Sequence, residues 1–218
     1  MTGFPGSPPL VKGGLVLVEP ASGTVLNIIT LQYNPDSLSR SFQVQAVGET
    51  SDRTHPLRLK APAVETIKVE AELDAADQLE FPDRFPDTAR LGVHPQLALL
   101  ENLIYPTVRQ LVSADQLGAL GTLEIAPMEA PLTVFVWSAS RIVPVRLTDL
   151  SVTEEAFDPN LNPLRAKVSL GMRVLTVNDV GFSHRAGVLY LAHQSRKEAL
   201  AGRVARGAFG SLGIGGLA

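Results

Sequence analysis

The segment from Leu132 to Val177 constrains the fold of this chain most, because it contains three extended runs in succession. Leu132 to Trp137 is rich in β-branched and aromatic residues, which favour strands. Val145 to Phe157 and Arg165 to Val177 flank a segment with two prolines and two asparagines. In the last run apolar and polar residues alternate, as in a strand with one buried and one solvated face. The segment therefore predicts a long hairpin with a multi-residue turn, preceded by another strand.

Four more strands are expected upstream. Leu15 to Val18 and Thr24 to Leu31 surround a turn and predict one hairpin, and Ser39 to Val47 and Val64 to Leu73 predict a second. The connection in the second pair, 48–62, is too long for a simple turn. Loops of that size in a compact domain are usually functional or become ordered against a partner.

Helical patterns lie between and after these strands. Pro95 suits the first position of a helix that continues to Tyr105 and is stopped by Pro106. Ser183 can cap a basic helix that runs to about Arg206. Weaker patterns predict short helical pieces within 74–93, a helical piece at Val108 to Leu117 and a short strand at Leu123 to Ala126.

These elements predict three parts. Residues 1–14 form a Pro- and Gly-rich N-terminal arm, and 15–177 form one mainly β domain. Residues 178–218 form a C-terminal helix followed by a Gly-rich apolar tail. A chain of 218 residues can bury a core of that size.

Composition excludes several classes of protein. The net charge of −3 gives no global argument for binding nucleic acid or an anionic membrane. The absence of cysteine excludes disulfides and cysteine-based zinc sites. The N-terminus does not resemble a signal peptide, and no apolar run approaches the ~18 residues that a membrane span needs. We therefore expect a soluble intracellular protein.

Catalytic and cofactor motifs are not found in the sequence. The four histidines have no metal-ligand spacing, and no phosphate-binding or nucleophile-elbow motif occurs. Four acidic residues lie close together in the sequence, namely Glu70, Glu72, Asp74 and Asp77. Their density would suit a paired-carboxylate site, but their alternation along a strand predicts a solvated face instead. We expect no catalytic activity, no cofactor and no metal; a hydrolase using Asp74 or Asp77 is the remote alternative.

The order of several short motifs nevertheless resembles a known family. The motifs are Tyr33-Asn-Pro35, strand Ile67 to Leu73 closed by Asp74, helix Leu97 to Tyr105 closed by Pro106, strand Pro131 to Trp137, and Phe157-Asp158 followed by Pro163-Leu-Arg165-Ala166. Over residues 12 to 177 they resemble the tube protein family of contractile injection systems, which are phage-tail-like machines. Within that family the chain is most similar to the tube-initiator, or hub-adaptor, component of the baseplate.

The resemblance implies a mainly β (α+β) fold, a phage tail-tube-like β-sandwich or barrel with one flanking helix. It also implies a homohexameric ring between the spike hub and the inner tube, assembled in the bacterial cytoplasm and incorporated into a phage-tail-like particle. Baseplate wedge or sheath proteins are further partners that the C-terminal tail could contact; nucleic acid and membrane insertion are not expected. An inner-tube subunit that polymerises into many rings is the alternative. Related chains often carry a LysM-like module after this domain, which is missing here, so a glycan-binding role is not implied.

The residues expected to carry this role fall into two groups. The channel-facing group is Lys68, Glu70 and Glu72, on the polar face of one strand. The interface group comprises Tyr33, Asn34, Pro35, Arg53, His55, Phe157, Asp158, Arg165, Arg196 and Arg203.

Overall fold

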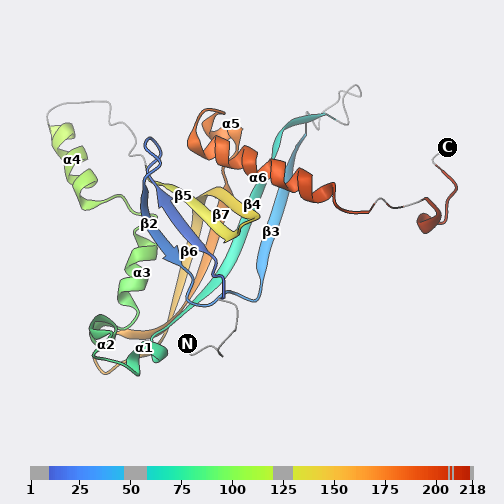
Figure 1. The fold of residues 1–218 in the computed structure, drawn as a ribbon. Helices are drawn as coiled ribbons and strands as arrows, with labels where there is room; N and C mark the ends of the chain where they lie inside the picture. The colour runs from blue at the N-terminus through green and yellow to red at the C-terminus, as the bar shows by residue number, and fades with distance from the viewer. Residues whose placement is uncertain (1–9, 47–57, 120–129, 206, 208, 217–218) are drawn as a thin grey trace.

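The computed structural model describes residues 10–46, 58–119, 130–205, 207 and 209–216. It contains one seven-stranded antiparallel sheet with helices beside it, which confirms the mainly β fold (Figure 1). The strands are β1 Gly14–Val18, β2 Val25–Thr30, β3 Leu38–Ala46, β4 Leu59–Asp74, β5 Leu132–Ser138, β6 Arg141–Phe157 and β7 Pro163–Val174. The helices are α1 Ala76–Leu79, α2 Pro86–Leu91, α3 His94–Glu101, α4 Val108–Ala119, α5 Val177–Val180 and α6 Arg185–Ala201, with a 3₁₀ turn at Phe209–Leu212.

The sheet is open rather than closed into a barrel. Its strand order is β2-β1-β5-β6-β7-β4-β3, so β2 and β3 are the two edge strands. Both predicted upstream hairpins are present, as the pairs β1–β2 and β3–β4. The predicted hairpin around the proline-rich turn is the pair β6–β7.

Strand β6 divides the sheet into two layers. Its first residues pair with β5 as far as Val145, whereas its register with β7 runs from Val145 to Phe157. The outer layer consists of β2, β1, β5 and the start of β6; the inner layer consists of β3, β4, β7 and the rest of β6. Figure 1 shows the blue strands β1 and β2 crossing in front of β7. Side chains of both layers meet in one core, which contains Phe135 and Leu15 together with Leu170 and Ile67.

The alternation in β7 and β4 has the predicted effect. Five apolar residues of β7 are 1% exposed or less: Ala166, Val168, Leu170, Met172 and Val174. Their neighbours on β4 are Ile67, Val69, Ala71 and Leu73, which are buried on the same face. Burial of apolar surface stabilises a fold by about 25 cal/mol per Å², so this shared face contributes to the stability of the protein.

Helix α3 covers the open flank of the core, where Leu97 and Leu100 are buried. It ends at Glu101, four residues earlier than predicted, and continues only as turns before Pro106. Gly92 connects α2 to α3 with φ of +60°, and a Cβ there would collide with the carbonyl oxygen of Pro163. Glycine is therefore required where this segment crosses the start of β7.

Helix α6 differs from the prediction at both ends. Its N-cap is His184, whose Nδ1 accepts a hydrogen bond from the backbone N–H of Ala186 at 3.1 Å; Ser183 is not the cap. The helix ends at Ala201 rather than near Arg206. Ala186 and Gly187 are buried, so the start of α6 packs against the body of the protein. The predicted strand at 123–126 lies outside the described residues.

Candidate assembly surfaces

One face of the inner layer carries polar side chains on adjacent strands. The register places Lys68, Glu70 and Glu72 of β4 opposite Gly171, Ser169 and Lys167 of β7. On β6, Ser151 and Thr153 fall opposite Ser169 and Lys167. Lys68, Glu70 and Glu72 are exposed, which confirms the predicted solvated face, whereas their position in a channel stays a prediction.

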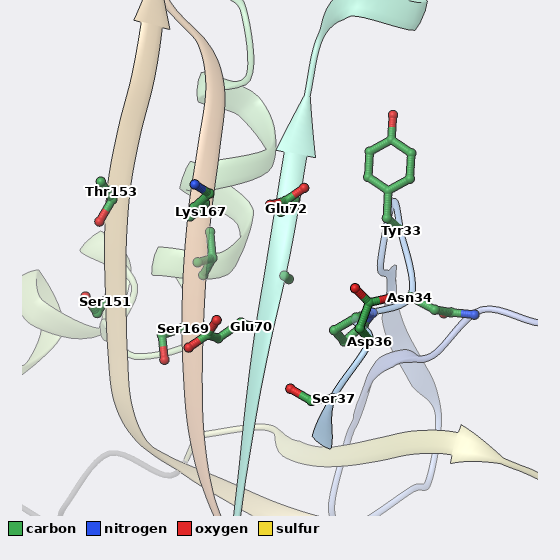
Figure 2. A pocket seen from close by; sticks show the side chains of 13 residues that line it. Tyr33, Asn34, Asp36, Ser37, Glu70, Glu72, Ser151, Thr153, Lys167 and Ser169 are labelled. Atoms are coloured by element: carbon green, nitrogen blue, oxygen red, sulfur yellow. The ribbon is translucent and has the colours of Figure 1, made fainter. Parts of the chain in front are cut away.

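This polar face is hollowed into an open trough of about 640 Å³ (Figure 2). The segment from Tyr33 to Ser37 lies along one side of the trough, beside β4, and β6 lies along the other. Charges of both signs line it, from the acidic Asp36, Glu70 and Glu72 and the basic Lys167. Lys167 contacts Glu155 at 3.1 Å. A second pocket shares Glu72 and Lys167 with the trough, and there Arg165 contacts Asp74 at 2.8 Å. Among the described residues, no group of three His, Asp or Glu could hold a metal ion.

The segment Tyr33-Asn-Pro35 is held by contacts within the chain. The Asn34 side chain accepts a hydrogen bond from the backbone N–H of Gly13 at 2.9 Å and donates one to the carbonyl of Val11 at 2.8 Å. Burial, with the nearby Asp77 carboxylate, raises the pKa of Tyr33 above its usual value. The carboxamide of Asn34 is thus occupied, although the segment still borders the trough.

The turn between β6 and β7 has a fixed shape. Asp158 accepts hydrogen bonds from the backbone N–H groups of Asn160 at 2.7 Å and Asn162 at 2.8 Å, and from the Asn162 side chain at 2.8 Å. The side chain of Asn162 is the main reason that the pKa of Asp158 is lowered, because the bonds favour the carboxylate. The turn holds Phe157 and Leu161 50% and 76% exposed.

The two flanks of the inner layer end in strands with unpaired edges. On β3, Phe42 is 52% exposed and Val44 is 65% exposed. On β6, the edge beyond Val145 has no partner strand among the described residues, and Leu150 and Val152 are only partly buried. Exposed edges with apolar side chains are a hazard for a monomer and are normally covered or paired. In Figure 1 the β3 edge lies on one side of the molecule, and α3 and α4 lie on the other.

A buried charge cluster joins α6 to the β3–β4 pair, and the sequence analysis missed it. Glu65 is 5% exposed; its Oε1 lies 2.7 Å from Arg40 Nε, and its Oε2 lies 3.7 Å from Lys197 Nζ. The Arg40 guanidinium stacks over the Phe42 ring, 4.8 Å from its centroid. The sequence did contain a signal for the burial of Glu65, because this residue falls on the same strand face as the buried Ile67 and Val69.

His193 of α6 lies buried beside this cluster. It is 3% exposed, and among the described residues neither ring nitrogen has a hydrogen-bond partner. Burial lowers its pKa below the usual 6.5, and Lys197, Arg40 and Arg141 act in the same direction, while Glu65 opposes them.

We predict that acid weakens the folded state through His193. Folding keeps the imidazole neutral, whereas the unfolded chain binds a proton as the pH falls below about 6.5. The free energy of unfolding should therefore decrease from about pH 6.5 down to the lowered folded pKa, by at most about 1.4 kcal/mol per pH unit for one group. Urea unfolding between pH 7.5 and pH 5 measures this slope. His193→Leu should flatten it and His94→Gln should not; an equal slope in both variants would contradict the assignment.

The remaining predicted interface residues have varied positions. Arg165 is exposed and bonded through Nε to Asp74 Oδ2 at 2.9 Å, which raises its pKa further. Arg196 and Arg203 are exposed near the end of α6. Arg53 and His55 lie outside the described residues. Within the ranges that the structure describes, no helix is long and apolar enough to cross a membrane.

Comparison with known proteins gives little further information. No protein-family model matches the chain, and no curated protein matches it. A chain in a solved structure of the tail of an empty GTA particle, computed with helical refinement and C6 symmetry, is similar over 75% of this chain and 90% of its own length. The identity is 14% and the TM-score is 0.28, so this likeness carries no argument about the role of this protein.

Proposed function

We propose that this protein is a structural baseplate component of a contractile injection system. In this role it forms a hexameric ring that joins the spike hub to the inner tube and initiates tube assembly. The observation that carries the proposal is the pair of unpaired strand edges, β3 and the second half of β6, on opposite sides of one four-stranded layer. The family, and the six copies in the ring, come from the resemblance that the sequence motifs show.

Strand direction favours a joint between these two edges. Each neighbouring pair in the inner layer is antiparallel, and the layer has an even number of strands, so β3 and β6 run in opposite directions. In a ring in which all copies point the same way, β3 of one copy meets β6 of the next as an antiparallel pair. A joint between β3 and the other edge strand, β2, would be parallel and slightly less stable per residue.

The faces of the two edges also match. On β3 the polar Ser39 and Ser41 fall on the face of Lys68 and Thr66, whereas Phe42 falls on the opposite face. On β6 the polar Ser151 falls on the first face, and Leu150 and Val152 fall on the second. Pairing β3 with β6 therefore brings polar side chains together on one face and apolar side chains together on the other.

The closed ring would be a continuous antiparallel barrel with four strands from each copy. Closure leaves no exposed sheet edge in this layer. We place the trough face with Lys68, Glu70 and Glu72 toward the channel, since water-exposed polar side chains suit a lumen. The mixture of both charge signs there disfavours tight binding of a strongly charged molecule in transit.

Some residues of the predicted interface group would lie at or near this joint. Tyr33 lies beside Glu72 and Asp74, just before the start of β3, and so on the flank that a neighbouring β6 would cover. Phe157 and the rigid turn after it lie at the end of the inner layer, where the hub or the tube would stack. The exposed Arg196 and Arg203 are available to wedge or sheath proteins. Assembly would take place in the bacterial cytoplasm.

The position of Asp74 counts against a hydrolase that uses this residue, which is one form of the remote alternative. Its Oδ1 accepts a hydrogen bond from the backbone N–H of Ala76 at 2.8 Å, and its Oδ2 is paired with Arg165. Both oxygens are therefore engaged in holding the start of α1 and the first residues of β7, which is a structural role. A general base needs an oxygen that can reach a substrate proton.

Copy number in assembled particles tests the proposal. We expect six copies per particle, in one ring next to the hub. A large multiple of six would instead favour the inner-tube alternative, and absence from the particles would reject both assignments. Electron microscopy of particles, with quantification of the subunits by mass spectrometry, measures both numbers.

A further inference from the structure

An apolar groove of about 380 Å³ lies beside the end of α3, and Figure 1 shows α3 on the flank of the molecule opposite to β3. The groove is enclosed by the turns after α3, the start of β5 and the bend of β6. Its apolar lining includes Leu103, Ile104, Leu132, Leu147, Leu175 and Val180. Ile104 is 46% exposed, so the groove is open to solvent in the single chain.

The groove lies where the unpaired edge of β6 begins. Val145 is the last residue of β6 that pairs with β5, and it borders the groove together with Arg146 and Leu147. Leu147 pairs with Met172, a core residue, and therefore belongs to the apolar face of the inner layer. Any strand that pairs with β6 would place its own apolar face next to this groove.

The pairing of the strands shows which residue of β3 lies level with Leu147 across the layer. Leu147 is opposite Met172, Met172 is opposite Ile67, and Ile67 is opposite Arg40. Phe42 follows two positions later on the same face of β3, level with the groove. Val44, which is 65% exposed, lies two residues further toward the tip of the hairpin, where the β3–β4 register shifts.

Phe42 is held in an orientation suited to an interface anchor. The residue is 52% exposed; the Arg40 guanidinium lies 4.8 Å from the centroid of its ring, and Lys197 Nζ lies 6.0 Å from it. Arg40 is in turn fixed by the buried Glu65. An exposed aromatic ring that is already ordered loses little conformational entropy on docking, as is typical of binding hot spots.

We propose that this groove is the socket for Phe42 of a neighbouring copy of the same chain, with Val44 at its rim. The inference rests on the proposed ring and specifies the apolar contact that accompanies the β3–β6 joint. Without this contact, both the groove and the exposed ring would remain in water on opposite flanks of each copy.

Cysteine cross-linking tests the socket directly, because the natural chain has no cysteine. The variant with Val44→Cys and Ile104→Cys keeps Phe42 and changes two exposed positions. Mild oxidation should produce a ladder of covalent oligomers that ends in a closed ring, while each single variant should give none beyond dimer. The matched control, Val25→Cys with Ile104→Cys, uses the other edge strand and should give no ladder.

The outcomes separate the socket from the ring. A native mass of six chains without the 44–104 ladder, or a ladder only in the 25–104 control, would overturn the socket and leave the ring. A wild-type chain that is monomeric would overturn the proposed ring as well. In addition, Phe42→Ala should weaken assembly by on the order of 30-fold or more, the effect of losing a hot-spot residue. Phe81→Ala, at a similarly exposed ring between α1 and α2, should leave assembly unchanged.

Discussion

Val44→Lys should prevent the ring from closing, whereas Val25→Lys should leave it intact. Both valines lie on edge strands, and they are 65% and 52% exposed, so neither change should alter the stability of one chain by more than about 0.5 kcal/mol. In the proposed joint, however, the lysine introduced on β3 would be held at the apolar rim of the groove and desolvated without a partner. Burying an unpaired charge costs several kcal/mol at each joint, which corresponds to at least ~100-fold weaker association.

Sedimentation velocity at matched concentrations measures this difference. We expect monomers for Val44→Lys and the wild-type oligomer for Val25→Lys, with equal thermal unfolding of the dilute chains. A ring that survives Val44→Lys and is lost in Val25→Lys would show that β2, rather than β3, forms the joint.

Glu65→Gln should destabilise the protein by on the order of 3 kcal/mol and loosen α6. Among the described residues, Glu65 is the carboxylate that pairs with both Arg40 and Lys197, and it is 5% exposed. Removing one partner of a buried pair leaves the other charges without compensation, which is more costly than losing a surface pair. Arg40 would also lose its fixed position over Phe42, so assembly should weaken together with stability.

Urea unfolding measures the loss of stability, and limited proteolysis within 185–201 measures the loosening of α6. Asp87→Asn is the control, because Asp87 and Arg90 form an exposed pair at 3.9 Å that should contribute less than about 1 kcal/mol. If Glu65→Gln changed stability no more than this control, the cluster would not hold α6.

Local patterns predicted the strands well and their ends less well. The alternation in 64–73 identified β4, but β4 begins at Leu59 and continues through Pro62. Proline is tolerated there because β7 pairs with β4 only from Thr66 onward, and because the β3–β4 register shifts near this point. Pro144 similarly concealed the start of β6, which begins at Arg141.

The surfaces that depend on distant contacts were harder to predict. The polar face of β4 follows from period-two alternation alone, and Lys68, Glu70 and Glu72 were placed correctly on it. The burial of Glu65 follows from the alternation in β4. Its pairing with Lys197 and the burial of His193, however, require the position of α6 against the sheet, which no local pattern contains. The apolar groove likewise combines residues that follow α3 with residues of β5 and β6, and so has no signal in any one segment.

The native mass of the purified full-length chain tests the central claim most directly. We predict a closed oligomer of six copies of the 23.3 kDa chain, with no continuous series of larger species. A strict monomer at all accessible concentrations would contradict the ring, and with it the proposed place between hub and tube.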